Sequence, residues 1–200
     1  MISVIDYGAG NLHSVENALR NCGAQYEFIR DSASVTRASK IILPGVGNFG
    51  QMMRALDRLH LREPLREAIG AGVPFLGVCL GLQALFDSSE EAPDERGLAI
   101  FPGAVRRFTG LRVPHMGWNT LHRLRDSAIL EGAGAQPFVY FANSYYAPLI
   151  DATSASCEYG APFSAVIERA NIAAVQFHPE KSGAAGLRVI GNFAGNFACS

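Results

Sequence analysis

Short apolar runs alternate with helical periodicity along the first half of the chain. A run of branched residues at 2–6 is followed by a glycine turn, and the helical pattern over 11–21 places Leu12, Val15 and Leu19 on one side. The same reading predicts strands at 26–29, 40–43 and 75–78 and helices at 51–59, 61–69 and 80–86. Strands that alternate with helices are typical of a mostly parallel sheet with helices on both faces.

The second half of the chain has a different pattern of hydrophobic and polar residues. It shows strand-like runs separated by short turns, at 105–108, 118–121, 138–141, 154–159 and 163–167, which favour antiparallel pairing. A strand at 173–177 and an amphipathic helix at 184–197 then return to the earlier pattern. The acidic segment 88–96 is predicted to be the longest exposed loop. We therefore expect one α/β domain over 1–200, a central mostly parallel sheet flanked by helices with an antiparallel strand-rich segment in its second half.

Composition narrows the classes of function. With 200 residues, of which 48% are hydrophobic, the chain is expected to fold as one packed globule rather than to stay disordered. Seventeen Lys and Arg against 18 Asp and Glu leave a net charge of -1, which argues against nucleic acid or an anionic membrane surface as partner. The uncharged run 68–86 is broken by glycines and Pro74, which favours a core strand over a membrane span. The N-terminus lacks the basic region of a secretory signal, so we expect a cytoplasmic protein.

Two kinds of cofactor site are not indicated. The four cysteines, Cys22, Cys79, Cys157 and Cys199, form no C-x-x-C pair and are predicted to be free thiols, without zinc or a disulfide framework. The glycine turn at 7–10 lacks the third glycine of a dinucleotide-binding fingerprint. No metal and no cofactor are therefore expected.

The sharpest chemical signal is Gly77-Val78-Cys79-Leu80-Gly81. It places a nucleophile between two glycines, directly after a buried strand and before a helical stretch, as in a nucleophile elbow. A strained strand-to-helix turn needs small neighbours, and the N-terminus of the new helix favours a thiolate. A buried structural cysteine in a glycine-rich turn is the alternative.

A base and oxyanion donors are available at other strand ends. His178-Pro179-Glu180 follows a predicted strand, and in an extended chain His178 and Glu180 project to the same side, so that the carboxylate can orient the imidazole. A surface histidine in a turn is the other interpretation. The backbone N–H of Leu80 and the glycine-rich loop 44–50 can supply oxyanion donors.

Other polar residues have weaker signals. Gln83 lies on the nucleophile's side of its helix, where its amide could bind a polar substrate or simply face solvent. His115 has no nearby carboxylate and is interpreted as structural or interfacial. Five arginines are predicted to form a solvated face: Arg106, Arg107, Arg112, Arg123 and Arg125.

Taken together, segments 77–83 and 176–182 resemble the class I, or triad, glutamine amidotransferases, whose fold is flavodoxin-like. Within that family the chain is similar to the glutaminase subunits of imidazole glycerol phosphate synthases. The resemblance covers nearly the whole chain, and its further matches are 6–12, 43–47, 114–119, 140–141 and 144–145.

The resemblance implies a mechanism. Cys79 would attack the side-chain amide of glutamine and form a γ-glutamyl thioester, with His178 and Glu180 as its partners and with Gly47 and Leu80 as oxyanion donors. Ammonia would pass to a separate cyclase subunit, a (β/α)8 barrel, in a heterodimer that serves histidine biosynthesis. The implied substrate-binding residues are Gln83, Asn143, Ser144 and Tyr145, and the implied interface residues are Asn11, Met116, Trp118, Asn119 and Lys181. The chain departs from many relatives at Asn143, where they carry histidine.

Three other interpretations stay open at this point. The chain could be a stand-alone thiol hydrolase or peptidase of the same superfamily, which needs no barrel partner. It could supply ammonia to a paralogous synthase that makes a different product. A non-enzymatic binding module is the third, but such a module is expected to have lost part of the triad, and all three candidate members are present.

Overall fold

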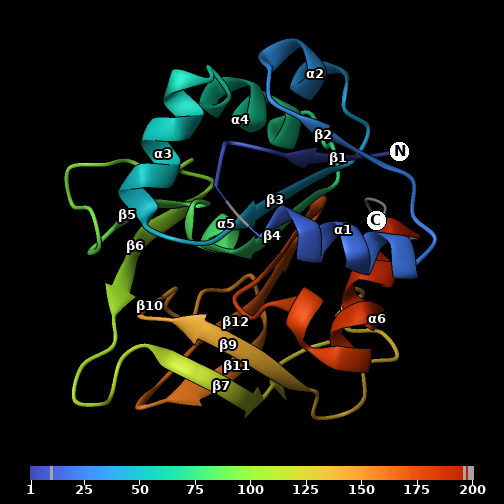
Figure 1. The fold of residues 1–200 in the computed structure, drawn as a ribbon. Helices are drawn as coiled ribbons and strands as arrows, with labels where there is room; N and C mark the ends of the chain where they lie inside the picture. Colours follow the sequence, from blue (N-terminus) through green and yellow to red (C-terminus); the bar gives the residue numbers. More distant parts are fainter. Residues whose placement is uncertain (10, 196, 198–200) are drawn as a thin grey trace.

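The computed structural model describes residues 1–9, 11–195 and 197, so Cys199 lies outside the described part. An eight-stranded sheet runs through the molecule in the order β2-β1-β3-β4-β13-β12-β11-β8 (Figure 1). Its strands are β1 (Ile2–Ile5), β2 (Tyr26–Ile29), β3 (Ile41–Gly45), β4 (Phe75–Cys79), β8 (His122–Arg123), β11 (Thr153–Tyr159), β12 (Ala161–Arg169) and β13 (Ile172–Val175).

The parallel half of this sheet positions the chemistry. β2, β1, β3, β4 and β13 pair in parallel, whereas β12, β11 and β8 continue the sheet by antiparallel pairing. β4 lies between β3 and β13, with Gly45 opposite Cys79 and Val175 opposite Val78. Because parallel strands end at the same edge, the segments after β3, β4 and β13 meet there. The predicted α/β class with an antiparallel second half is confirmed.

Two hydrophobic cores lie on the two faces of the sheet. Successive residues of β3 alternate between them: Ile41 and Leu43 belong to one core and Ile42 to the other. The first core is covered by α2 (Ser32–Arg37), α3 (Phe49–Arg58) and α4 (Arg62–Gly70), and the second by α1 (Leu12–Asn21) and α6 (Gly183–Ala194) (Figure 1). The inner strands β1, β3, β4 and β13 are therefore buried on both faces, which explains their mostly apolar runs.

Two predicted details are wrong. Helix α2 was not predicted, because Val35 is its one large apolar residue and a single such position carries no periodicity; the helix begins where the Asp31 side chain accepts the backbone N–H of Ser34. The helix predicted over 80–86 ends early, since α5 covers only Leu80–Gln83 and the chain then enters the strand β5 (Phe86–Ser89). An apolar run of this length does not distinguish a helix from a buried strand.

The remaining strands form two small sheets. β5 pairs in parallel with β6 (Phe101–Arg107), which pairs with β10 (Tyr145–Tyr146), while β7 (His115–Thr120) and β9 (Phe138–Asn143) form an antiparallel pair. Segment 88–96 is only in part the exposed loop that was predicted: Glu90, Pro93, Asp94 and Arg96 are exposed, but Ser88 and Ser89 belong to β5. Ser88 bridges Arg96, Ser89 is buried, and the Glu91 side chain accepts the backbone N–H of Phe49 at 2.7 Å, at the start of α3.

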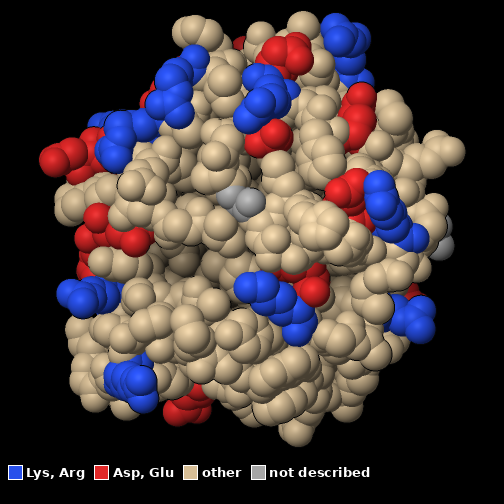
Figure 2. All heavy atoms as spheres, in the orientation of Figure 1, with Lys and Arg blue, Asp and Glu red and all other residues tan. Residues whose placement is uncertain are grey.

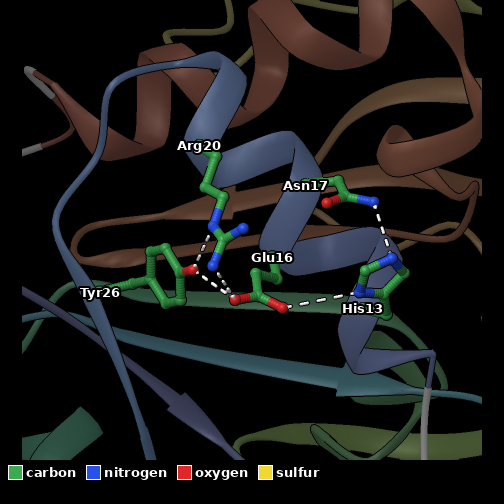
Figure 3. Close-up of polar contacts among 5 residues, drawn as sticks. All are labelled: His13, Glu16, Asn17, Arg20 and Tyr26. Carbon is green, nitrogen blue, oxygen red and sulfur yellow. Dashed lines mark hydrogen bonds and ion pairs between the residues drawn. The ribbon is translucent and has the colours of Figure 1, made fainter.

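A surface network ties α1 to β2 (Figure 3). The Glu16 carboxylate accepts the Tyr26 hydroxyl at 2.7 Å and the Arg20 guanidinium at 2.8 Å, and Arg20 also donates to the Tyr26 hydroxyl. The Tyr26 hydrogen bond, followed by the charges of Arg20 and His13, lowers the pKa of Glu16. The network therefore anchors α1 to the strand β2.

Charge is mixed on the surface. On the face shown in Figure 2, acidic and basic side chains are interspersed and neither sign gathers into a large patch. In the described part of the chain, no helix is both long and apolar enough to cross a bilayer.

Candidate active site

Cys79 ends β4 in a strained turn. Its backbone has φ 54° and ψ −104°, in the left-handed half of conformational space that a side chain disfavours, and α5 begins at the next residue. A Cβ at Gly77 would lie 2.6 Å from the carbonyl oxygen of Gly81, and one at Gly81 would lie 2.0 Å from that of Leu43. Both glycines are therefore required by close backbone approach, and the predicted elbow is what the turn forms.

The strain at Cys79 has a measurable consequence. We expect Cys79→Gly to unfold at a higher temperature than Cys79→Ala, by about 3 °C. Glycine removes the strain of a positive φ, which costs a residue with a side chain roughly 1–3 kcal/mol, but the greater conformational entropy of glycine in the unfolded chain offsets part of this gain. Thermal unfolding followed by circular dichroism checks the order. Cys157, in β11 and without a positive φ, is the matched control, and there the glycine variant should be the less stable one. The same order at both positions would contradict strain at the elbow.

His178 and Glu180 form a buried pair at the end of β13. The imidazole Nδ1 lies 2.8 Å from Oε1 of Glu180, and the two side chains are 4% and 3% exposed. The extended course expected for this segment is wrong after His178, because Pro179–Lys181 form a 3-10 turn. Proline fits the first position of such a turn, so the turn, rather than an extended strand, brings the carboxylate back to the imidazole.

The electrostatics of this pair involve the nucleophile. Burial disfavours the imidazolium of His178, but the charge on the Cys79 sulfur, a hydrogen bond with that sulfur, and Glu180 outweigh it and raise the pKa of His178 to about 10. The imidazole therefore stands between sulfur on one side and carboxylate on the other. This is the order that a nucleophile, a base and an orienting acid require.

A cavity of about 300 Å³ opens over these groups. The candidate residues that line it come from the segments that follow β3, β4 and β13 and from the junction of β9 and β10: Gly47, Cys79, Leu80, Gln83, Asn143, Ser144, Tyr145, His178 and Lys181. The sequence thus predicted most of the wall. Lys181, which was assigned to a partner interface, lies on the surface at this cavity.

The two residues predicted as oxyanion donors lie at a helix start and in a glycine turn. Leu80 begins α5, so its N–H is one of the first-turn donors without a partner inside the helix. Gly47 has φ 100° and open space around its Cα, as a turn that must reorient an amide requires. Burial raises the pKa of the nearby Tyr7 hydroxyl to about 12, and the charge of Cys79 adds to this shift. The backbone amide of Val46 opposes the shift, although it does not complete a hydrogen bond to the hydroxyl.

The amides of Gln83 and Asn143 converge on one carbonyl. Gln83 is 3% exposed, so the solvent-facing interpretation of this glutamine is excluded. Its Nε2 and the Nδ2 of Asn143 both donate to the backbone oxygen of Tyr145 at 2.9 Å. Within the described residues the Asn143 Oδ1 is buried without a partner. What Asn143 offers the cavity is therefore a hydrogen-bond acceptor.

Sequence reasoning missed Glu91. It lines the cavity from the segment that was predicted to be an exposed acidic loop. No local pattern marked it, since it is one of several acids in that segment and its role depends on the contact with the start of α3. It gives the cavity a carboxylate that is not engaged with Cys79 or His178.

Of the residues expected at a partner interface, some are exposed and others are half-buried. Met116 and Trp118 on β7 are 66% and 48% exposed, and Trp118 stacks on Phe138, which is 56% exposed and was not predicted. Asn119 is half-buried and donates to the backbone oxygen of Glu158 at 3.0 Å. Asn11 is half-buried in front of α1, where its side chain forms no capping hydrogen bond.

Histidine and arginine predictions fare differently. His115 is buried and stacks on Tyr159 and Phe141, which agrees with its structural interpretation. The predicted solvated face agrees with the exposed positions of Arg106, Arg107, Arg112 and Arg125, but Arg123 is half-buried and donates to the backbone oxygen of Leu130 at 2.6 Å. The Arg123 guanidinium thereby adds a second hydrogen bond to a carbonyl that already accepts the backbone N–H of Ala133.

No group of three or more His, Cys, Asp or Glu side chains in the described ranges is arranged to hold a metal ion. The cysteines Cys22, Cys79 and Cys157 are free.

Comparison with known proteins agrees with this geometry. The profile of the family "Glutamine amidotransferase class-I" matches residues 3–195. The chain is 50% identical to the imidazole glycerol phosphate synthase subunit HisH of Methanothermobacter thermautotrophicus, over 96% of this chain and 97% of that one. It is 44% identical to the HisH subunit of Salinibacter ruber, over 97% and 94%.

A longer relative and a solved structure add to this. The chain is 46% identical to the chloroplastic imidazole glycerol phosphate synthase hisHF of Arabidopsis thaliana, over 96% of this chain but 34% of that one. A crystal structure of a glutamine amidotransferase superposes with a TM-score of 0.76 at 19% identity, over 97% of this chain and 98% of that one, and so shares the fold. The chain therefore belongs to the class-I glutamine amidotransferase family and, within it, with the HisH subunits of imidazole glycerol phosphate synthase.

Proposed function

We propose that this chain, as a single amidotransferase domain over 1–200, is the glutaminase subunit of an imidazole glycerol phosphate synthase. It hydrolyses glutamine to glutamate and ammonia and supplies the ammonia to a separate cyclase subunit in histidine biosynthesis. The observation that carries the proposal is the cavity lined by Cys79 and His178, with Glu180 2.8 Å behind the imidazole. The cytoplasmic location stays a prediction.

The reaction follows from these three side chains. His178 takes the proton of the Cys79 thiol, and the sulfur attacks the side-chain carbonyl carbon of glutamine. When the carbon–nitrogen bond breaks, His178 returns the proton to the leaving nitrogen, which departs as ammonia and leaves a γ-glutamyl thioester. A water molecule, deprotonated by His178, then attacks the thioester and releases glutamate and the thiol. Glu180 holds the imidazole in the tautomer that these transfers need and stabilises the imidazolium.

The rest of the cavity suits an amino acid. The N–H groups of Leu80 and Gly47 are the donors for the oxygen that becomes negative in the tetrahedral intermediate. Glu91 supplies a carboxylate for the α-ammonium group, and the unpartnered Oδ1 of Asn143 is an acceptor for a substrate N–H. Ser144 and Tyr145 complete the wall. A small zwitterion with a terminal amide matches this set of groups.

The partner is a cyclase subunit with a (β/α)8 barrel fold. An exposed apolar patch of Met116, Trp118 and Phe138 supports a protein contact near the cavity, because clustered exposed aromatic residues mark interaction surfaces. Two thirds of the Arabidopsis hisHF chain lie outside its match to this chain, which fits a second functional part in that relative.

A glutaminase assay with and without the cyclase subunit tests the proposal. Slow glutamine hydrolysis by the chain alone, strongly increased by the cyclase with its ribonucleotide ligand, is the expected result. Full activity of the chain alone would favour the stand-alone hydrolase instead. Stimulation by a different synthase subunit, and none by the cyclase, would point to the paralogous enzyme.

Trp118→Ala is expected to weaken cyclase binding. Loss of a central aromatic anchor costs roughly 2–3 kcal/mol, so the dissociation constant measured by calorimetry should rise about 30- to 160-fold. The matched control is Phe28→Ala, an exposed aromatic residue on β2 at the opposite end of the fold from β7 (Figure 1). Equal affinities of the two variants would remove Trp118 from the interface, while unstimulated activity of both should equal that of the wild type.

A further inference from the structure

Gln176 directly follows β13 and was given no role by the sequence or by the proposed reaction. Its side chain is fully buried, and its Nε2 lies 3.5 Å from the Cys79 sulfur. It stands two residues before His178. The nucleophile therefore has a second neighbour besides the imidazole, from the same strand end.

The orientation of this amide is determined by its surroundings. The backbone oxygen of Tyr145 can only accept, so the end of Gln83 that faces it at 2.9 Å must be the NH₂ group. That NH₂ group also lies 3.1 Å from Gln176, which must therefore present its carbonyl oxygen to it. The NH₂ group of Gln176 is then left to face the sulfur. A backbone carbonyl thus sets, through two side-chain amides, which atom meets the nucleophile.

The position calls for such a donor. Cys79 is 6% exposed, so a negative charge on its sulfur has little water to stabilise it. The helix that begins at Leu80 has only four residues and offers few aligned amides. The titratable groups that face the sulfur are His178 and Tyr7, and the latter is a neutral phenol that cannot balance the charge.

We propose that Gln176 stabilises the Cys79 thiolate by an N–H···S hydrogen bond, and that Gln83 and the Tyr145 carbonyl hold the Gln176 amide in the orientation this requires. Gln176 is then a catalytic residue, because it touches the reacting atom. Gln83 is a positioning residue that acts through it as well as a wall of the cavity.

Alkylation of Cys79 by iodoacetamide, followed at its own peptide by mass spectrometry, tests this without glutamine and without a partner. Gln176→Met keeps the length of the side chain and removes the N–H groups. At pH 7 its Cys79 should react about tenfold more slowly than in the wild type, because hydrogen bonds to charged groups are the stronger ones and the thiolate is the reactive form. Gln176→Glu, which directs a carboxylate at the sulfur, should react more slowly still.

The pH dependence separates a charge effect from damage to the fold. At a pH high enough to ionise the thiol in every variant, the rates should converge on that of the wild type. A structural control is Asn171→Leu, at the other end of β13, which removes a buried amide that donates to the backbone oxygens of Ile69 and Val73. It should lower the melting temperature and leave the alkylation rate unchanged.

Two results would overturn the inference: a wild-type alkylation rate in both Gln176 variants, or a deficit that persists at high pH. With glutamine and saturating cyclase, we expect kcat of Gln176→Met to fall about tenfold while KM changes less than twofold. The inference rests on the proposed function only for this last measurement. A wild-type chain that fails to hydrolyse glutamine would defeat the proposed function, whereas the alkylation rates would still decide the role of Gln176.

Discussion

Cys79→Ala is expected to lower glutamine hydrolysis by at least about 10⁴-fold, to the limit of the assay. In the proposed reaction the sulfur is the atom that forms the γ-glutamyl thioester, and no other described group that lines the cavity can replace it as a nucleophile of comparable strength. The loss should appear in kcat, since the groups that bind the α-carbon end of glutamine remain. Steady-state release of glutamate, with the cyclase subunit present, is the measurement.

The matched control for this variant is Cys157→Ala. Cys157 is equally buried, and burial raises the pKa of its thiol to about 12, so it stays a neutral core side chain. This variant should keep the turnover of the wild type and lose some stability. Unchanged turnover in Cys79→Ala would instead disprove the thioester mechanism and favour a binding module that retains the fold.

His178→Asn is expected to lower kcat by about 10³-fold. Asparagine retains a polar group next to Glu180 but can neither take the proton of the thiol nor return it to the leaving nitrogen. An electrophilic glutamine analogue should label Cys79 much more slowly in this variant at pH 7, because the sulfur loses its base. Labelling and turnover at wild-type rates would show that another group deprotonates the sulfur.

The same residue defines a pH dependence. The folded pKa of His178, about 10, lies above its ordinary value of 6.5, so the stabilisation from the imidazolium is fully present below pH 6.5 and is lost as the pH rises through about 10. Glutaminase activity should therefore have an alkaline limb close to pH 10 rather than close to 6.5. The free energy of unfolding, from urea titrations at pH 7 and above pH 10, should fall more for the wild type than for His178→Asn. Equal losses in the two proteins would contradict the charged pair.

Much of the parallel sheet was predictable because its strands are buried on both faces. Their apolar runs stand out between helices, and the predictions 40–43 and 75–78 fall within two residues of the bounds of β3 and β4. Segment 80–86 was mispredicted because a helix of one turn is followed almost at once by a strand, and the polar residue at the end of the helix, Gln83, is itself buried and compatible with a continuing helix. Helix α2 was missed because its formation depends on a cap at Asp31 more than on an apolar stripe.

For the site, the sequence by itself determined which reactive groups are present. They are a thiol between two glycines, which a close approach of the backbone requires, and a histidine and a glutamate at the end of another strand. The spacing of residues along the chain predicts these features, because each of them depends on a turn of a few neighbouring residues. Tertiary structure alone decided what the cavity contains besides them. Glu91 reaches it through its contact with the start of α3, and Gln176 faces the sulfur because Gln83 and the Tyr145 carbonyl, from distant segments, orient its amide. An amide or a carboxylate has no local pattern that tells which way it points, since its partners are set by packing between elements far apart in the chain.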